Sequence, residues 1–389
     1  MVNINDFSED RFSRFGLISW WDQKKLSNAK VLVIGAGALG NEILKNLSLL
    51  GVGNIFLVDM DLIENSNLSR SILFREKNNG KYKSEIAAQA VKDIFPQVNI
   101  NYLCGNVLFD LGLGVFRWAD VVVAGLDNRE ARLFINRCCW KTNTPWIDGA
   151  IEQLNGVARV FVPPDGSCYE CAMSKVDMDI IRLRKSCSLL TRDEMLEGKV
   201  PTTPTSASVI AGIQCQEAVK LIHGLPVLKS KGFIFNGLTH DSYIIEYPRK
   251  DECFSHETYE NIEDLDISIA DIKLKSLLSI AKERLGNDAI IELNHEIVSK
   301  LDCPSCGFSK EVYKILGNVK PNEAICEKCG SQMTPSIFHN FDINEDIPDK
   351  TFQEIGIPPF DIIKARSGLD ECCFCFFGDA QKVLGSQLI

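Results

Sequence analysis

The stretch that decides the fold is KVLVIGAGALGNEILKNLSLLGVGNIFLVDMD, residues 30–61. Residues 31–34 form an apolar run typical of a buried strand, and a glycine-rich turn follows. Apolar residues then recur at helical spacing up to Gly51, a residue type that often ends a helix. Residues 55–58 form a second apolar strand. This order predicts a β-α-β unit, and because both strands are apolar throughout, we expect a doubly wound α/β fold around a mostly parallel, Rossmann-like sheet.

Polar residues stand at the end of each predicted strand. Gly35 follows the first strand and Asp59 the second, while Asp127 and Asn128 come shortly after a third apolar run at residues 121–124. The carboxyl ends of parallel strands meet at one edge of an open sheet, where ligands of α/β proteins bind. We therefore predict a ligand site at this edge.

Three glycines, Gly35, Gly37 and Gly40, match the fingerprint of a dinucleotide-binding turn between a strand and a helix. They allow the backbone to approach phosphates, whose charge is favoured by the N-terminus of the following helix. Asp59 is spaced to bind a ribose hydroxyl. These features alone do not separate NAD from ATP.

The segment after the second strand favours ATP. Asp61 is followed by a polar stretch that contains Asn67, Arg70 and Lys83. Several cations and an amide beside a ribose site suit a triphosphate, because they would neutralise charge that develops on the α-phosphate during acyl attack. Asp127 is an acid at a strand end, which suits it to hold magnesium.

In this order the motifs resemble those of the ubiquitin-activating-enzyme superfamily, which includes the bacterial ThiF- and MoeB-type adenylyltransferases. The resemblance covers about residues 10–225. It implies ATP-dependent adenylation of the C-terminal glycine of a ubiquitin-like protein, with magnesium as a cofactor. The matching motifs are Arg11-Phe-Ser-Arg14, the loop from Gly35 to Gly40, Asp59-Met-Asp61, Asn67-Leu-Ser-Arg70, Gly80-Lys-Tyr-Lys83 and Leu126-Asp-Asn128.

The resemblance also implies a role for each position. Asp59 would bind the ATP ribose, and Asp127 would ligate magnesium. Arg14 would reach into the active site of a partner subunit, which implies a homodimer. Ser71 departs from the pattern, because the family usually has glutamine there. The residues that would hold phosphates and stabilise the transition state are Asn67, Arg70 and Lys83.

A charged and then Pro- and Thr-rich segment, at about residues 176–205, is expected to be a mobile crossover loop. It contains Cys187, and the nearby cations of Arg182, Arg184 and Lys185 would favour its thiolate form. In the activating enzymes that form a thioester, the catalytic cysteine sits in this crossover. Cys187 is therefore the candidate nucleophile, and the alternative is a loop cysteine without a catalytic role.

The 15 cysteines indicate metal binding. The chain is long, the count is odd, no export signal is visible, and several cysteines form C-x-x-C pairs, so zinc in a reducing compartment is favoured over disulfides. Cys168 and Cys171 form the first pair. In the resembling family a second C-x-x-C completes the set, and here that place holds Cys253-Phe-Ser-His256. We therefore predict a structural zinc site with three cysteine ligands and one histidine ligand. The alternative partners of the first pair are Cys303 and Cys306.

A second zinc site is predicted further along the chain. Two knuckles separated by about twenty residues have the spacing of a zinc ribbon. Their internal pairing would give a second structural ion with four cysteine ligands. The expected ligands are Cys303, Cys306, Cys326 and Cys329.

The composition becomes more polar near residue 260, where we predict a domain boundary. Residues 1–260 would form the ThiF/MoeB-like adenylation domain, and residues 261–389 a smaller zinc-containing α/β domain that docks a partner. An apolar helix is expected at residues 208–223 and a buried strand around residues 372–375. The cysteines expected to be core residues are Cys104, Cys138, Cys139 and Cys215.

The formal net charge of -10 argues against a nucleic-acid binder, whose surface would be basic. No apolar run approaches the roughly 18 residues of a membrane helix, and no signal peptide is visible. These features lead us to expect a cytoplasmic protein without nucleic-acid or membrane partners.

The expected reaction is adenylation of a ubiquitin-like protein, transfer to Cys187 as a thioester, and passage to a conjugating enzyme. A sulfur-carrier adenylyltransferase of the thiamine or molybdopterin type, without a thioester, is the alternative. An NAD-dependent oxidoreductase and an inactive scaffold are alternatives from other classes. The joint presence of Arg14, Arg70, Lys83 and Asp127 argues against the scaffold.

Overall fold

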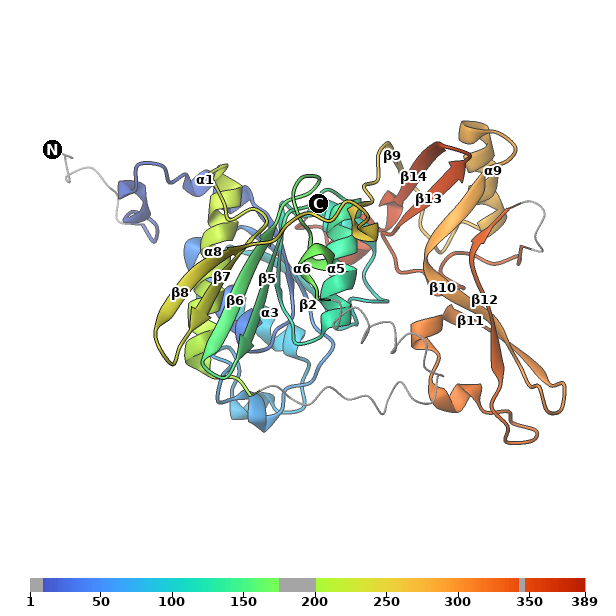
Figure 1. Ribbon diagram of the computed structural model, residues 1–389, viewed down its shortest axis with the longest axis horizontal. Helices are drawn as coiled ribbons and strands as arrows, with labels where there is room; N and C mark the ends of the chain where they lie inside the picture. Colours follow the sequence, from blue (N-terminus) through green and yellow to red (C-terminus); the bar gives the residue numbers. More distant parts are fainter. Residues whose placement is uncertain (1–9, 175–200, 343–346, 389) are drawn as a thin grey trace.

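The computed structural model describes residues 10–174, 201–342 and 347–388. A sheet of eight strands, in the order β3-β2-β1-β4-β5-β6-β7-β8, forms its larger unit (Figure 1). The five strands from β3 to β5 are parallel, and β6, β7 and β8 continue the sheet in antiparallel fashion. The strands are β1 (Lys30–Ile34), β2 (Asn54–Val58), β3 (Asn99–Leu103), β4 (Val121–Gly125), β5 (Trp146–Glu152), β6 (Asn155–Phe161), β7 (Lys231–Asn236) and β8 (Asp241–Glu246).

Helices cover both faces of this sheet, as a doubly wound fold requires. Alternate residues of β1 show the division: Val31 and Val33 pack with α2, α3 and α8, whereas Leu32 and Ile34 pack with α4 and α5 on the other face. The helices are α1 (Gln23–Asn28), α2 (Ala38–Leu50), α3 (Lys83–Ile94), α4 (Leu113–Trp118), α5 (Arg129–Lys141), α6 (Tyr169–Ala172) and α8 (Pro204–His223).

Local signals explain the helix limits. Gly51 ends α2 in the left-handed conformation, at φ 78°, as the sequence predicted. The helix expected at residues 208–223 begins earlier, at Pro204, because Thr203 caps it by accepting a hydrogen bond from the backbone N–H of Ser206. Among the described residues, none of the helices is both long and apolar enough to span a membrane.

The C-terminal residues build a second sheet in the order β11-β10-β13-β14-β9, with β12 beside β10 (Figure 1). The strand expected around residues 372–375 is β14, which is buried along most of its length. Helix α9 packs on this sheet around a separate apolar core. The elements are β9 (Ile262–Leu265), α9 (Leu274–Leu285), β10 (Ile290–Asp302), β11 (Ser309–Ile315), β12 (Thr334–Phe341), β13 (Ile362–Ser367), β14 (Asp370–Phe376) and α10 (Ala380–Leu384).

The two sheets share a continuous apolar layer. Ile362 and Cys375 of the second sheet, together with Phe360 just before β13, belong to the same core as the α4–α5 face of the first sheet. The buried Asp361 also accepts a hydrogen bond of 2.8 Å from the backbone N–H of Leu113, at the start of α4. The first sheet ends before residue 260 and the second begins after it. These contacts show that the C-terminal unit packs against the first unit and is not merely linked to it.

One expected core residue is not buried. Cys104 is exposed, whereas Cys138, Cys139 and Cys215 are buried as predicted. Cys104 directly follows the last residue of β3, which is an edge strand, so no neighbouring strand covers it. Its apolar neighbours in sequence did not reveal that the strand had already ended.

Candidate functional site

The glycine turn between β1 and α2 is built so that only glycine fits at two positions. A Cβ atom on Gly35, whose φ is +95°, would lie 2.6 Å from the carbonyl oxygen of Gly125. A Cβ atom on Gly40 would lie 1.9 Å from the carbonyl oxygen of Gly35. Gly37, by contrast, caps α2 and faces open space. The turn therefore leaves open space in front of the N-terminus of a 13-residue helix. A helix N-terminus of this kind favours a bound phosphate.

Asp59 lies at the carboxyl end of β2 and braces this turn. Its carboxylate accepts hydrogen bonds from the backbone N–H groups of Ala36, at 2.6 Å, and Asp61, at 2.8 Å. Burial raises the pKa of Asp59 above the usual range of an aspartate, although these donors and the ammonium of Lys83 oppose that effect. A ligand hydroxyl that donates to this carboxylate would be a further favourable partner.

Cations and an amide surround the next part of the edge. Lys83, the first residue of α3, is 9% exposed and its Nζ lies 2.7 Å from Asp61 Oδ2. Arg70 donates from Nη1 to the carbonyl oxygen of Ser66 at 2.8 Å. The side-chain oxygen of Asn67 accepts the backbone N–H of Glu64. The ammonium of Lys83 is thus paired with the carboxylate of Asp61, and a phosphate could replace this carboxylate as its partner.

The end of β4 carries two polar residues with different roles. Asn128 caps α5 by accepting the backbone N–H groups of Glu130 and Ala131. Asp127 is exposed, and none of the hydrogen bonds or ion pairs found in the described chain involves its carboxylate. One free carboxylate beside phosphate oxygens is a donor set that suits magnesium. The residues present therefore fit a magnesium ion held by Asp127.

A single cavity of about 1360 Å³ unites these groups. Gly40, Asn128 and Arg14 do not line it: the first two support the turn and the helix, and Arg14 is exposed in the N-terminal segment before a 3₁₀ helix, Phe15–Leu17. The sequence-predicted residues that line the cavity are Gly35, Gly37, Asp59, Asp61, Asn67, Arg70, Lys83 and Asp127.

The cavity continues beyond the glycine turn into a part that the sequence did not predict. It runs over β6, β7 and β8, and its volume exceeds the roughly 300–1,000 Å³ of small-molecule pockets. Helical spacing after Asn128 could have identified Arg129 and Arg132, but the register of β5 and β6, which brings Arg159 to the wall, is not readable from sequence. The main lining residues of this part are Arg129, Arg132, Glu152, Asn155, Val157, Arg159, Tyr169, Ile234, Asn236 and Tyr243.

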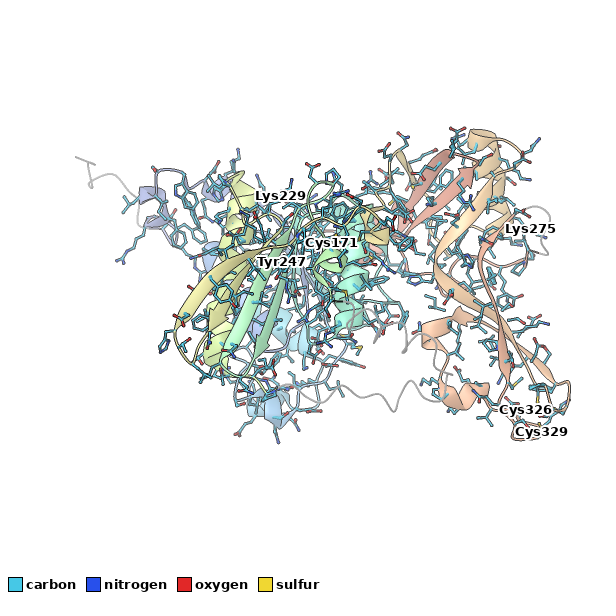
Figure 2. All side chains as sticks on the ribbon, viewed as in Figure 1. Cys171, Lys229, Tyr247, Lys275, Cys326 and Cys329 are labelled. Atoms are coloured by element: carbon cyan, nitrogen blue, oxygen red, sulfur yellow. The ribbon has the colours of Figure 1, made fainter. Side chains whose placement is uncertain are left out.

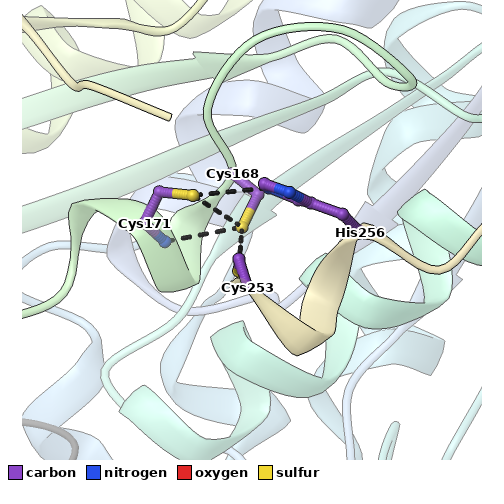
Figure 3. Close-up of side chains that lie close together, drawn as sticks. All are labelled: Cys168, Cys171, Cys253 and His256. Atoms are coloured by element: carbon purple, nitrogen blue, oxygen red, sulfur yellow. Dashed lines mark hydrogen bonds between the residues drawn. The ribbon is translucent and has the colours of Figure 1, made fainter. Parts of the chain in front are cut away.

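The first cysteine cluster lies beside this cavity, and Figure 3 shows its four side chains converging. Cys168 Sγ lies 3.6 Å from Cys171 Sγ and 3.5 Å from Cys253 Sγ, and Cys171 Sγ lies 3.3 Å from His256 Nε2. The ring of Trp140, on α5, stacks on His256 with a centroid distance of 4.3 Å. The first pair thus meets the later Cys-x-x-His half-site and not Cys303 and Cys306.

The second cluster is made by two similar turns. Each contains a Cys-x-x-Cys pair followed by a glycine with positive φ, at 70° in Gly307 and 75° in Gly330. The sulfur atoms of Cys303 and Cys329 lie 3.4 Å apart, and those of Cys306 and Cys326 lie 3.6 Å apart. These four cysteines form one cluster, as the ribbon spacing predicted.

Both clusters fit a tetrahedral zinc ion. In each, the four ligand atoms all lie within 4.8 Å of one another. Zinc–sulfur bonds of about 2.3 Å in tetrahedral geometry place sulfur atoms roughly 3.8 Å apart, close to the separations found here. In the first cluster, the backbone N–H groups of Cys171 and Lys250 also point at sulfur atoms, which stabilises thiolates. The clusters could hold one zinc ion each.

The predicted nucleophile cannot be placed. Cys187 lies outside the described residues, as does most of the segment expected to form the crossover. The chain leaves the described part after Ser174 and returns at Pro201. Met173 and Thr202, at these two ends, both line the cavity. The segment that contains Cys187 therefore starts and finishes at the candidate site.

Comparison with known proteins places this geometry in a family. The model described as the ThiF family matches residues 7–254. The NEDD8-activating enzyme E1 catalytic subunit of Dictyostelium discoideum is 42% identical over 158 residues, covering 37% of this chain and 35% of that protein. The SUMO-activating enzyme subunit uba-2 of Caenorhabditis elegans is 36% identical over 155 residues, covering 39% and 27%. The matched stretch thus spans about a third or less of these relatives.

Solved structures agree. E. coli MccB, crystallised with ATP, superposes with a TM-score of 0.54 at 25% identity, covering 65% of this chain and 75% of that chain. Its complex with AMPCPP and MccA superposes with a TM-score of 0.52. Because the family match extends over more than half of the residues and includes the whole first sheet, the chain belongs to the ThiF family.

Proposed function

We propose that this chain uses ATP to adenylate the C-terminal glycine of a small ubiquitin-like protein. One observation supports the proposal: a single cavity is lined by the glycine turn, the half-buried carboxylate of Asp59, the cations of Arg70 and Lys83 and the exposed carboxylate of Asp127. We assign Asp59 to the ribose, the two cations to the phosphates and Asp127 to magnesium. An NAD site would need no such set of cations beside the ribose position. The relatives named NEDD8- and SUMO-activating enzymes support the class of partner.

The chemistry follows from the positions of the charges. An oxygen of the partner's terminal carboxylate attacks the α-phosphorus of ATP, and pyrophosphate leaves with the electron pair of the broken P–O bond. Arg70 and Lys83 stabilise the negative charge that builds up on the phosphoryl oxygens. Asp127 would hold magnesium, which supplies further charge neutralisation. The part of the cavity over β6, β7 and β8 gives the partner's extended tail room to reach the reacting phosphate.

A second step would move the acyl group from the adenylate to Cys187. The thiolate attacks the acyl carbon, AMP leaves, and a thioester forms, which a conjugating enzyme then accepts on its own cysteine. Cys187 is about 13 residues from each end of its segment, and an extended chain spans up to roughly 3.5 Å per residue. Met173 and Thr202, on either side of this segment, both line the cavity, and the length of the chain between them supports the role that we propose for Cys187.

Adenylation is tested by ATP–pyrophosphate exchange with a ubiquitin-like protein that ends in glycine. We expect exchange that depends on the partner's terminal glycine. Partner-independent exchange, or none, would count against the proposal. The thioester is tested on a non-reducing gel, where an adduct that forms with ATP, disappears with dithiothreitol and is absent in Cys187→Ala supports it.

Adenylation without a thioester is the second candidate, and the likeness to MccB crystallised with the peptide MccA favours keeping it. A sulfur-carrier adenylyltransferase would behave in the same way. This candidate predicts that the wild-type protein forms no reducible adduct and that Cys187→Ala retains pyrophosphate exchange. Both readings use the same nucleotide site, so they differ only in the fate of the adenylate.

Arg14 enters the proposal through a homodimer in which it reaches the partner subunit's site. Its exposed position in the N-terminal segment, beside the exposed apolar side chains of Leu17 and Trp20, supports this placement. Mixing Arg14→Ala with Lys83→Ala should restore about a quarter of the exchange activity, because half of the subunits pair with the other variant and one site in each mixed dimer is intact. No recovery would exclude an arginine supplied by the partner.

The C-terminal unit, residues 261–389, is proposed to dock a partner such as the conjugating enzyme, with its zinc ribbon as the outermost part. A cytoplasmic location completes the proposal, since cysteine ligands stay reduced there. Deleting residues 303–333 and measuring transfer to the conjugating enzyme would test docking, provided that exchange activity persists.

A further inference from the structure

A buried carboxylate beneath the cavity holds two arginines. Asp148, on β5, is completely buried. Its Oδ1 lies 2.9 Å from Arg132 Nε, and its Oδ2 accepts a hydrogen bond of 2.6 Å from Arg159 Nη1. Arg159 also donates from Nε to the hydroxyl of Tyr247 at 3.3 Å. None of these residues belongs to a motif described above.

The fold explains the arrangement. Asp148 and Arg159 are direct cross-strand partners in the antiparallel β5–β6 pair, so their side chains share one face of the sheet. Arg132 comes from the first turns of α5, which begins immediately after Asn128. The three residues therefore connect the residue that follows β4 to the paired positions Asp148 on β5 and Arg159 on β6.

Arg132 does more than neutralise Asp148. Its Nη2 donates to the carbonyl oxygen of Leu126 and, at 3.1 Å, to the carbonyl oxygen of Gly149. Leu126 directly precedes Asp127, the acid that fits magnesium. The guanidinium is thus a clamp between the residue that follows β4 and the middle of β5, and it is held there as the ion-pair partner of Asp148.

Arg159, the second arginine paired with Asp148, does not form a clamp of this kind. Arg159 bonds to Asp148 and Tyr247 and lies 5.7 Å from the centre of the Tyr169 ring, and among the described residues none of its hydrogen bonds reaches the end of β4. The two arginines therefore share a carboxylate but differ in the one contact that concerns Asp127.

We propose that Arg132, whose charge is balanced by Asp148, is a positioning residue that fixes the carboxylate of Asp127 for magnesium through the carbonyl of Leu126. The inference rests on the proposed adenylation, because that reaction places magnesium at Asp127. Outer contacts of this kind orient metal ligands, and their loss weakens metal affinity by about 10–100-fold.

The test compares Arg132→Lys with Arg159→Lys. Each lysine keeps a positive charge beside Asp148, but a lysine at position 132 is a point charge that cannot bridge both carbonyls. Binding of Mn²⁺ to the protein with a non-hydrolysable ATP analogue, followed by electron paramagnetic resonance, should weaken about tenfold in Arg132→Lys and stay unchanged in Arg159→Lys. The magnesium concentration for half-maximal pyrophosphate exchange should rise in parallel.

Unchanged Mn²⁺ affinity in Arg132→Lys, or an equal loss in both variants, would overturn the inference. If Arg132→Lys does not fold, Arg132→Met replaces it, since Arg159 still neutralises Asp148 there; the same loss of affinity is expected. Failure of the proposed function looks different, because wild-type protein would then show no pyrophosphate exchange at any magnesium concentration.

Discussion

Two cysteine clusters of similar composition occupy contrasting places in the molecule. Figure 2 shows Cys171 in the middle of the larger unit, and Cys326 and Cys329 at the far end of the C-terminal unit. In the first cluster Cys168 and Cys171 are buried, and the second half-site comes from residues far along the chain. In the second cluster two of the four cysteines are exposed, and all four come from neighbouring turns.

The two cysteine clusters also differ in the residues that they pack against. The first cluster packs on Trp140 near the C-terminus of α5, and the same helix begins next to Asp127. Tyr169, between two of its cysteines, also lines the cavity. Within the described residues, the second cluster packs on a small local core that includes Val298, Leu301 and Met333. We infer that a zinc ion in the first cluster would support the candidate site, whereas one in the second would support its own ribbon.

Loss of the first cluster should have the largest effect. Cys171→Ser removes a buried ligand, and we expect the free energy of unfolding to fall by about 4 kcal/mol or more, because structural zinc contributes directly to folding. Thermal unfolding should shift down by roughly 10 °C, with loss of one zinc per chain measured by elemental analysis. A variant that lost zinc yet kept its melting temperature would break the comparison.

Lys83→Ala should slow adenylation strongly without disturbing either cysteine cluster. Removal of a preorganised cation at the site of developing charge typically costs about 10²–10³-fold in rate, so pyrophosphate exchange should fall by that factor. Zinc content should remain that of the wild type. Lys81→Ala, two residues earlier and outside the cavity lining, is the matched control, and a similar loss there would argue against a specific role for Lys83.

Acid should loosen the junction between the two units. His295, on β10, stacks on Phe134 of α5, and burial together with the ammonium of Lys141 lowers its pKa to about 4. The unfolded chain binds this proton near pH 6.5, so stability from a neutral His295 is complete above that pH and is lost as pH falls toward 4. Denaturant unfolding should show this slope.

His295→Phe keeps the ring contact with Phe134 and removes the proton-binding site, so its stability should change less between pH 6.5 and 4 than that of the wild type. His339→Asn, at an exposed position on β12, is the control and should leave the slope unchanged. Parallel slopes in all three proteins would mean that the junction does not titrate through His295.

The smallest effect on adenylation is expected from the second cluster. Cys326→Ser should lose one zinc per chain, while pyrophosphate exchange stays within about twofold of the wild type, since the ribbon has its own core. A fall in exchange as large as that of Cys171→Ser would show that the two clusters are energetically linked.

The sequence was most informative where short-range pattern decides structure. The alternation of apolar runs and glycines predicted β1, α2 and β2, and the Cys-x-x-Cys spacing predicted the ribbon. The first cluster was predicted only with help from the family resemblance, because its half-sites are far apart. The proposed residue assignments in the cavity stay predictions until tested.

What could not be predicted depends on register and on edges. Asp148 and Arg159 meet because two strands pair in one register, which no local pattern reveals. Cys104 was wrongly expected in the core, because sequence does not show that β3 is an edge strand. The packing of the C-terminal sheet onto α4 was likewise missed, since it depends on a contact between Leu113 and Asp361 across distant parts of the chain.

The most direct test of the central claim is the intact mass of a ubiquitin-like partner after incubation with the Cys187→Ala variant, ATP and magnesium, because this variant cannot pass the acyl group on to a thioester. The account predicts that the partner gains one adenylyl group at its terminal glycine while pyrophosphate is released, and that removing this glycine prevents the gain. An unmodified partner, with ATP either untouched or cleaved to ADP, would contradict it.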